Sequence, residues 1–234
     1  QVKSIQVNGE QVFCDALIGA ADYHHIEQNL LPAKYRNYSS SFWYNSTLAP
    51  SCLIFYLGLN KKINKINHHT LFFDENLSKH ATEIYKTPQW PTKPLFYVCC
   101  PSVTDPTVAA PQDENLFFLM PLAPGLQDTE ELRNQYFNLM LDKFELTFDF
   151  NIKDHIIYKQ SYCIQNFIDD YNAFKGNAYG LANTLKQTAI LKPKMINKMV
   201  KNLFYCGQLT VPGPGVPPAI ISGKIVAELL SKKL

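Results

Sequence analysis

Short apolar runs recur through the middle of the chain, and their length and composition predict β-strands. The most apolar run covers residues 52–59, where both faces are apolar, so we expect it to be a central strand. Runs at residues 71–73, 95–100 and 116–120 predict three more strands. Because loops join these runs, the pattern favours a mostly antiparallel sheet in an α/β chain of the α+β kind.

A helical repeat follows these strands. Apolar residues recur at helical spacing over residues 130–148, and Glu130 and Glu131 lie at the start, where acidic side chains favour a helix. Residues 152–158 then predict a strand, and residues 165–171 predict a shorter helix. The proline-broken apolar run 117–126 is interpreted as a buried strand and turn, with contact to a membrane interface as the alternative.

The first residues predict a β-hairpin, because Asn8-Gly9 suits a type I′ turn between two short strands. Residues 15–21 then predict a short buried strand that ends in small residues. Small residues at a strand end let a ligand or a helix come close, although tight packing alone gives the same pattern.

The end of the chain predicts a strand, a loop and a helix. Residues 203–206 are a compact apolar run, residues 208–216 are a loop in which glycine and proline alternate at 212–215, and a helix opens at Pro217-Pro218. The positive end of that helix would attract an anion or a developing negative charge. Gly223 inside the helix costs about 1 kcal/mol relative to alanine, which indicates close approach by a backbone or a flat ligand. A plain strand-to-helix connection is the alternative.

Charge and composition narrow the function classes. The formal net charge of +2 excludes the strongly basic surface of a nucleic-acid-binding protein. No run of about 18 apolar residues is present, so the sequence predicts no transmembrane helix. The six cysteines include no CxxC pair, which favours reduced thiols in a cytosolic protein over a disulfide frame or a zinc site. His24-His25 and His68-His69 lack the spacing of metal motifs, so we expect no metal site and a structural role.

The closing segment resembles the C-terminal flavin-contacting signature of carotenoid desaturases of the bacterial phytoene desaturase type. Its matching residues in this chain are Gly207, Pro212, Gly213, Gly215, Val216, Pro217, Ser222 and Gly223. The chain departs from that signature where Val211 replaces histidine and where Pro214 and Pro218 replace glycine. These departures bear on the fine geometry of the loop.

Two more segments extend the resemblance over nearly the whole chain. The proline-punctuated loop after the third strand matches the family at Pro101, Ser102, Thr104, Asp105, Pro106, Ala110 and Pro111. Residues 176–181, GNAYGL, resemble a segment of the family that borders the flavin, with Gln187 downstream and Lys192 in place of the usual arginine.

The resemblance implies a domain organisation and a cofactor. Residues 1–25 would be returning strands of an FAD-binding domain, 26–170 a substrate-binding lobe, and 171–234 a flavin-contacting strand, loop and helix of an incomplete Rossmann-like domain. The resemblance assigns FAD contacts to Gly207, Gly213, Gly215, Val216, Pro217 and Pro218. It also implies that Tyr179 and Gln187 face the substrate, and it identifies no catalytic acid or base.

The implied activity is removal of hydride from C–C single bonds of a polyene such as phytoene. An apolar polyene substrate implies a cytoplasmic enzyme peripheral to a membrane surface; the oligomeric state is left open. The chain contains no GxGxxG after an initial strand, so we expect a C-terminal fragment of a longer enzyme that is inactive by itself.

Two alternatives remain open at this point. The first is a related flavin oxidoreductase, such as a carotenoid isomerase, a retinol saturase-like enzyme or an amine oxidase. The second is a non-catalytic module that binds an apolar ligand or a membrane.

Overall fold

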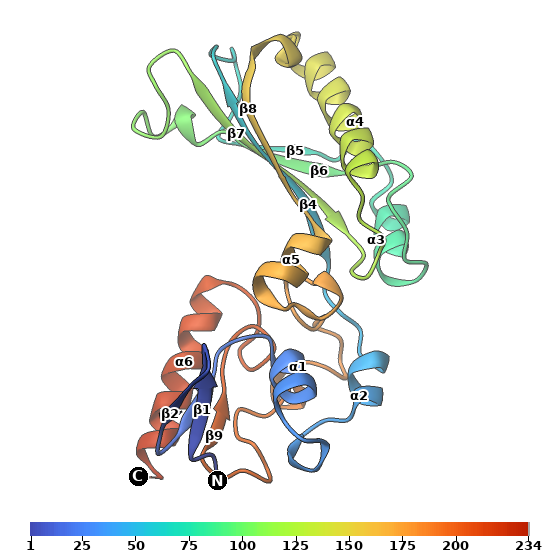
Figure 1. Cartoon of the computed structure of the whole chain (residues 1–234). Coiled ribbons are helices and arrows are strands. Elements are labelled where there is room, and N and C mark those ends of the chain that lie inside the picture. The colour runs from blue at the N-terminus through green and yellow to red at the C-terminus, as the bar shows by residue number, and fades with distance from the viewer. Residues whose placement is uncertain (234) are drawn as a thin grey trace. The chain divides into compact units, whose positions relative to one another are not determined.

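A computed structural model describes residues 1–233, which divide into two compact units (Figure 1). The first combines Gln1–Ala49 with Ile168–Leu234, and the second is Pro50–Phe167. Residues 26–49 pack in the first unit, where Trp43 and Leu48 join its core. The assignment of flavin and substrate binding to parts of the chain stays a prediction.

The second unit is built on a five-stranded antiparallel sheet in the order β5-β6-β7-β4-β8. Strand β4 pairs with β7 on one side and with β8 on the other, which confirms its predicted interior position. The mostly antiparallel sheet of the predicted fold class is confirmed as well. The strands are β4 Ser51–Leu59, β5 His69–Phe72, β6 Phe96–Cys99, β7 Glu114–Leu122 and β8 Ile156–Tyr162.

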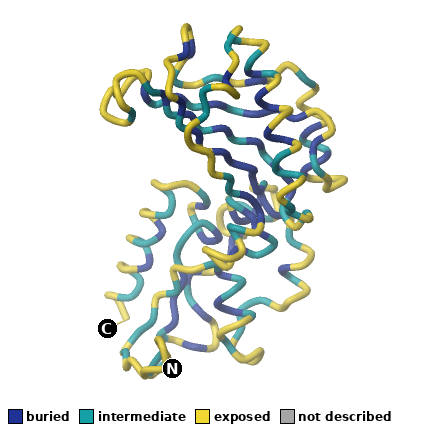
Figure 2. Tube along the Cα trace, turned by 45° about the horizontal axis from the view of Figure 1, so that its top comes forward, coloured by how far each residue is buried: buried dark blue, intermediate teal, exposed yellow. Residues whose placement is uncertain are grey.

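Helix α4, Glu130–Phe148, packs against one face of this sheet and has the bounds predicted from its apolar spacing. The Phe55 and Phe137 rings lie 4.6 Å apart, and the Phe118 and Phe144 rings 5.5 Å apart. Along β7 the buried and half-buried positions alternate, as expected for a strand with one face on a core. Figure 2 shows buried positions in dark blue along the strands of this sheet and exposed positions in yellow in its loops.

The interpretation of residues 117–126 as a buried strand and turn is confirmed, since they contribute Phe118, Met120 and Leu122 to this core. The prediction for residues 152–158 is wrong in its first half, because Ile152–His155 forms a 3₁₀ turn and β8 begins at Ile156. The turn buries Ile152 fully and brings the Lys153 ammonium within 2.6 Å of the Asp142 carboxylate on α4.

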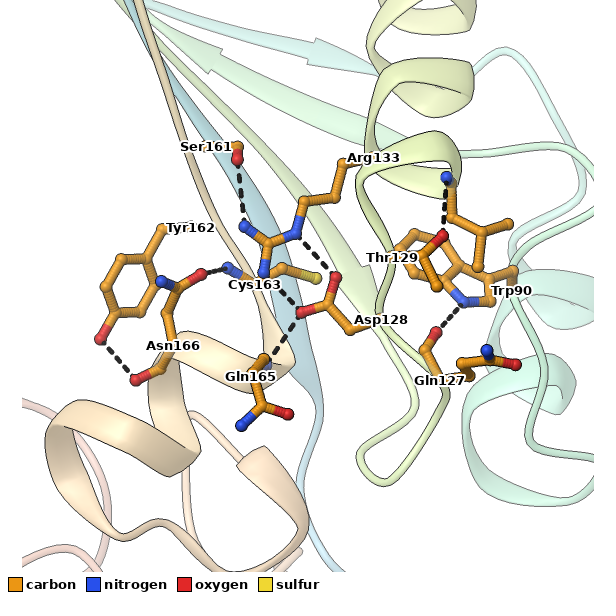
Figure 3. A network of polar contacts seen from close by, with 11 residues as sticks. Trp90, Gln127, Asp128, Thr129, Arg133, Ser161, Tyr162, Cys163, Gln165 and Asn166 are labelled. Carbon is orange, nitrogen blue, oxygen red and sulfur yellow. Dashed lines mark hydrogen bonds and ion pairs between the residues drawn. The ribbon is translucent and has the colours of Figure 1, made fainter.

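A buried ion pair ties the start of α4 to β8 and to the turn after it (Figure 3). The Arg133 guanidinium donates to both Asp128 oxygens at 2.7 and 2.6 Å and to Ser161 Oγ at 3.1 Å. The Gln165 amide also donates to Asp128, at 2.9 Å. Burial alone would raise the pKa of Asp128, but these hydrogen bonds hold that pKa below its ordinary value of 3.8.

Shorter helical elements complete the second unit and its connections. Helix α3 is Leu77–Tyr85, and the 3₁₀ helix η3 is Pro101–Val103. Helix α5, Ile164–Tyr171, confirms the short helix predicted near residues 165–171.

The first unit contains two separate pairs of strands. Strands β1, Ser4–Val7, and β2, Glu10–Phe13, form the predicted hairpin, with positive φ at both Asn8 and Gly9. Strand β3, Leu17–Gly19, pairs in parallel with β9, Leu203–Tyr205. The expectation that β3 is buried is wrong, because Ile18 is 40% exposed. Helix α6, Val216–Ser231, follows β9.

The remaining elements of the first unit are short helices: α1 Tyr23–His25, π-helix η1 Ile26–Leu30, η2 Ala33–Tyr35, α2 Ser40–Asn45, η5 Phe174–Gly176 and η6 Ala189–Leu191. Aromatic packing holds them to β9, since the Tyr23 ring stacks on the Tyr205 ring at 4.0 Å. The Glu27 carboxylate is fully buried and accepts hydrogen bonds from the Tyr205 hydroxyl and the amides of Asn37 and Tyr38.

Two sequence expectations about single residues can be checked here. All six cysteines lie in the described residues and are free, which confirms the absence of a disulfide frame. His24 has a structural role, because its ring stacks on Phe174 at 3.9 Å and burial lowers its pKa to about 4.

None of the helices within residues 1–233 combines the length and the apolar character that crossing a membrane requires.

Candidate functional site

The loop between β9 and α6 depends on glycine at three positions. Gly207, Gly213 and Gly215 have φ angles of 109°, 133° and 113°, which side-chain-bearing residues rarely adopt. Gly215 is the N-cap of α6, and the prolines that follow lie in its first turn, as predicted. The three glycines predicted to contact a flavin therefore all have a backbone reason to be glycine.

The first turn of α6 is open to solvent. Val216 is 75% exposed, and Gly215 and Pro217 are exposed as well. Because Pro217 and Pro218 carry no N–H, the amides of Gly215 and Val216 are the remaining donors at this end of the helix. The positive end of the helix dipole remains at this turn and favours negative charge. Only two amides, however, can donate hydrogen bonds to an anion there.

Ser222 anchors the loop to the helix. The Gly207 amide donates to Ser222 Oγ at 2.8 Å, and Ser222 Oγ donates to the Ala219 carbonyl at 2.7 Å. Next to it, Gly223 was expected to allow close approach by a backbone or a flat ligand. The backbone alternative is wrong, because no described atom from outside the adjoining backbone of α6 lies within 4 Å of where a Cβ would be at Gly223. The flat ligand stays a prediction.

Lys192 is the residue of this site that sequence reasoning missed. Its side chain is 2% exposed, and its ammonium has no hydrogen-bond partner among the described residues. A Cβ at Gly213 would lie 3.3 Å from Lys192 Cε and 3.5 Å from its Nζ, so the glycine makes room for the lysine. Burial lowers the pKa of Lys192. An unpaired buried cation is costly, so an electron-rich group next to the Lys192 ammonium would be stabilising.

The segment that carries Tyr179 lies against the same loop. A Cβ at Gly180, where φ is 72°, would lie 3.3 Å from the Gln208 carbonyl oxygen. The Gly180 amide donates to Asn177 Oδ1 at 2.6 Å, which fixes the turn beside Tyr179. Tyr179 itself is 42% exposed. The structure therefore brings the predicted substrate-side segment next to the predicted flavin loop.

Gln187 forms a backbone clamp. Its side chain accepts from the Thr47 amide and donates to the Thr47 and Ala182 carbonyls, at 2.8, 2.8 and 3.1 Å. These bonds fix the segment that follows Gly180, so Gln187 positions backbone, and its direct contact with a substrate stays a prediction.

The second unit offers a separate apolar pocket on the sheet face that α4 does not cover. The pocket has a volume of about 650 Å³ and contains few polar groups. Four aromatic side chains dominate it, and the Tyr56 and Phe117 rings lie 5.5 Å apart. Its lining residues are Tyr56, Leu57, Gly58, Tyr97, Cys99, Pro101, Asn115, Leu116, Phe117 and Tyr158.

A second pocket, of about 280 Å³, lies between the sheet and helix α3. Leu71, Phe73 and Leu119 form its sheet side, and Leu77 and Ala81 form part of its helix side. Tyr97 lines both pockets, so they are neighbours on the sheet. A long apolar chain could lie along both.

Comparisons with known proteins connect these features. No protein-family model matches the chain. The carotenoid 3,4-desaturase of Haloarcula japonica is 38% identical over 224 residues, which cover 96% of this chain and 45% of that protein. The chain is similar to one part of the carotenoid desaturases. The predicted resemblance is thereby confirmed.

Other relatives agree with this similarity. A 4,4'-diapophytoene desaturase of Staphylococcus haemolyticus is 29% identical, over 97% of the chain and 47% of that protein. The all-trans-zeta-carotene desaturase of Myxococcus xanthus is 27% identical, over 97% of the chain and 44% of that protein. The chain thus spans about half the length of the curated relatives it matches.

A solved structure supports the fold. The crystal structure of an oxidoreductase from Methanosarcina mazei aligns with a TM-score of 0.51 at 14% identity, over 94% of this chain and 44% of that chain. The alignment includes residues of both units and supports the fold alone.

Proposed function

We propose that this chain supplies the substrate-binding sheet and the ring-side loop of the flavin site in a carotenoid desaturase-like oxidoreductase. The observation that carries the proposal is the unpaired, buried Lys192 ammonium beside Gly213. It lies in a stretch that aligns with desaturases, at the loop that the family resemblance assigns to the flavin.

The residues of the first unit fit the ring end of a flavin. A bound FAD would supply the hydride acceptor for oxidation of a C–C bond. Exposed Gly215 lets the backbone approach a flat ring, Gly213 makes room for Lys192, and the exposed first turn of α6 would turn its positive end toward the ring. The Lys192 ammonium would stabilise the negative charge that a reduced ring carries.

The residues of the second unit fit an apolar, flat substrate. The aromatic pocket on the open sheet face and the neighbouring pocket under α3 would bury a polyene chain and exclude water from it. Within the first unit Tyr179 borders the flavin loop, and the family resemblance implies that it faces the substrate. No acid–base pair is required of the chain, because a carbocation left by hydride removal loses a proton readily.

Access to a lipid-dissolved polyene requires contact with a membrane surface, and we place the enzyme in the cytoplasm, peripheral to that membrane. Exposed apolar side chains in one segment of the first unit support this contact, since Leu185 is 92% and Ile190 is 82% exposed. Such side chains insert into the boundary between headgroups and acyl chains.

A chimera tests the proposal. The part of Haloarcula japonica carotenoid 3,4-desaturase that this chain matches is replaced by the chain, and the host's carotenoids are analysed by chromatography and absorption. We expect a flavin-containing protein and products with longer conjugation. A folded, flavin-loaded chimera that returns only isomerised or saturated carotenoids would instead support the related flavin oxidoreductases, and one with no product would support a binding module.

Lys192 provides the sharper variant in that chimera. Lys192→Met should reduce bound flavin and product, whereas Lys192→Arg, which restores a cation, should retain both. Equal flavin content in the Met variant would remove Lys192 from the proposal. The chain by itself should not bind FAD tightly, because the phosphate-cradling GxGxxG is absent from its sequence. A micromolar complex, measured by fluorescence quenching, would contradict that expectation.

A further inference from the structure

Two histidines and a cysteine meet where β5 pairs with β6. The antiparallel register places His69 directly opposite Cys99, and His68 precedes His69 with its ring 4.2 Å away. One ring nitrogen of each histidine and the Cys99 sulfur lie within 4.8 Å of one another. Neither the flavin loop nor the polyene pocket explains this combination of side chains.

Each histidine ring already has a hydrogen-bond partner at Nδ1. His68 Nδ1 lies 2.6 Å from Thr104 Oγ1, and His69 Nδ1 lies 2.5 Å from the Tyr97 hydroxyl. Metal-bound histidines typically use one ring nitrogen as ligand and hold the other by such a hydrogen bond, which fixes the ring and its tautomer. Thr104 and Tyr97 therefore leave Nε2 of each ring for a ligand role.

The chemistry of the three groups selects the kind of ion. Two imidazoles and one thiolate suit a borderline cation such as Zn²⁺, and hard cations such as Mg²⁺ and Ca²⁺ prefer oxygen. Bonds of about 2.0–2.3 Å to a tetrahedral ion place ligand atoms about 3.5 Å apart. The side chains need to close by only about 1 Å, and His69 is exposed and has room to move.

We propose that His68, His69 and Cys99 form a binding site for a Zn²⁺-class cation, with water as the fourth ligand. On binding, the Cys99 thiol loses its proton to solvent and its sulfur forms the metal–sulfur bond. The ion cross-links β5 to β6 at the mouth of the aromatic pocket, which Cys99 also lines. The expectation of no metal site was based on local motif spacing, whereas it is strand register that brings Cys99 to the histidines.

Cobalt titration of the whole, tag-free chain tests the site. The reduced and chelator-treated protein is titrated with Co²⁺, and the absorption spectrum is recorded. We expect one tightly bound Co²⁺ per chain, a near-ultraviolet thiolate-to-cobalt charge-transfer band and the intense visible bands of tetrahedral cobalt. Zn²⁺ should abolish them by displacement. Because no flavin or carotenoid is present, failure here leaves the proposed function untouched.

Four variants separate the site from adventitious binding. Cys99→Ser should abolish the charge-transfer band, His69→Gln should weaken Co²⁺ binding more than tenfold, and Thr104→Val should weaken it about tenfold through loss of the second ring partner. The double variant Cys14→Ser/His155→Gln, at positions outside the site, should bind as the parent does. Circular dichroism establishes that each variant is folded. A spectrum without the charge-transfer band, or one that persists in Cys99→Ser, overturns the proposal; exposed His69 keeps the test open should Cys99→Ser not fold.

Discussion

The two units of the chain differ in how completely each forms its own core. The second unit closes a five-stranded sheet over α4 with one continuous apolar cluster, in which Phe55, Phe118 and Phe144 are fully buried. The first unit has only the short parallel pair β3–β9 at its centre. Its core is smaller, and it leaves Ile18, Val216 and Ile220 exposed.

Parallel strands in complete domains are covered on both faces, so an isolated parallel pair is an unfinished sheet. The first unit compensates with aromatic stacking and buried polar bonds around Glu27. The second unit is therefore self-sufficient, whereas the loop between β9 and α6 is held by a scaffold with little apolar support.

The largest expected effect is in the sheet core. Phe118→Ala should lower the free energy of unfolding of the second unit by about 3–5 kcal/mol, because it leaves a cavity between β7 and α4. Hydrogen exchange of peptides from β4 and β7 at rising urea measures it, with peptides from β9 as the internal reference. Phe73→Ala, at a 55% exposed ring, is the matched control and should cost less than about 1 kcal/mol. Equal loss of protection in β9 would mean that the two units unfold as one.

Removal of the guanidinium at the start of α4 should have the next largest effect. Arg133→Met leaves the Asp128 carboxylate, whose side chain is 3% exposed, without its partner and should cost about 3 kcal/mol. Urea unfolding followed by circular dichroism measures the loss. The double variant Asp128→Asn/Arg133→Met should recover most of it, since no charge is then left buried. Failure to recover would show that packing of the arginine side chain matters more than its charge.

Acid should weaken the second unit through Asp128. The native pKa of this carboxyl is lowered, so the native state binds fewer protons than the unfolded state below about pH 4. The stabilisation is fully present above the unfolded pKa and is lost as pH falls through the native one. Unfolding free energies measured between pH 2 and 6 should fall less steeply in Asp128→Asn; an identical slope would assign the acid sensitivity to other groups.

The smallest expected effect lies in the first unit. There the substitution should raise the free energy of unfolding, whereas the substitutions of Phe118 and Arg133 lower it. Burial lowers the native pKa of Lys192. The free energy of unfolding of the first unit should therefore rise with pH, up to the pKa of about 10.5 that the lysine has in the unfolded chain. Lys192→Met should flatten that rise and stabilise the flavin-free chain at neutral pH. Hydrogen exchange of β9 as a function of pH is the measurement. A destabilised Met variant would mean that the ammonium has a partner in solution.

Periodicity predicted the second unit well. The spacing of Leu132, Tyr136 and Met140 set α4, and apolar residues on both faces of β4 predicted its interior place. The late start of β8 and the exposure of Ile18 were missed, because they depend on which neighbours a short segment meets in the folded chain.

The candidate site likewise has features that were predicted from the sequence and features that were missed. Its glycines and prolines follow from local backbone geometry and were predicted by resemblance. The unpaired Lys192 and the clamp at Gln187 arise from contacts distant in sequence, with Gly213 and Thr47 respectively. For Lys192 the sequence did contain one signal, because a lysine stands where the family has arginine.

The prolines at the start of α6 have a consequence for how a ring would be held. With Pro217 and Pro218 unable to donate, this end of the helix would act on a bound ring mainly through its dipole field and would contribute few directional bonds. A ring at this position could tilt or bend and still keep nearly all of its attraction to the helix dipole. Such latitude suits a group whose shape changes each time it gains and loses electrons.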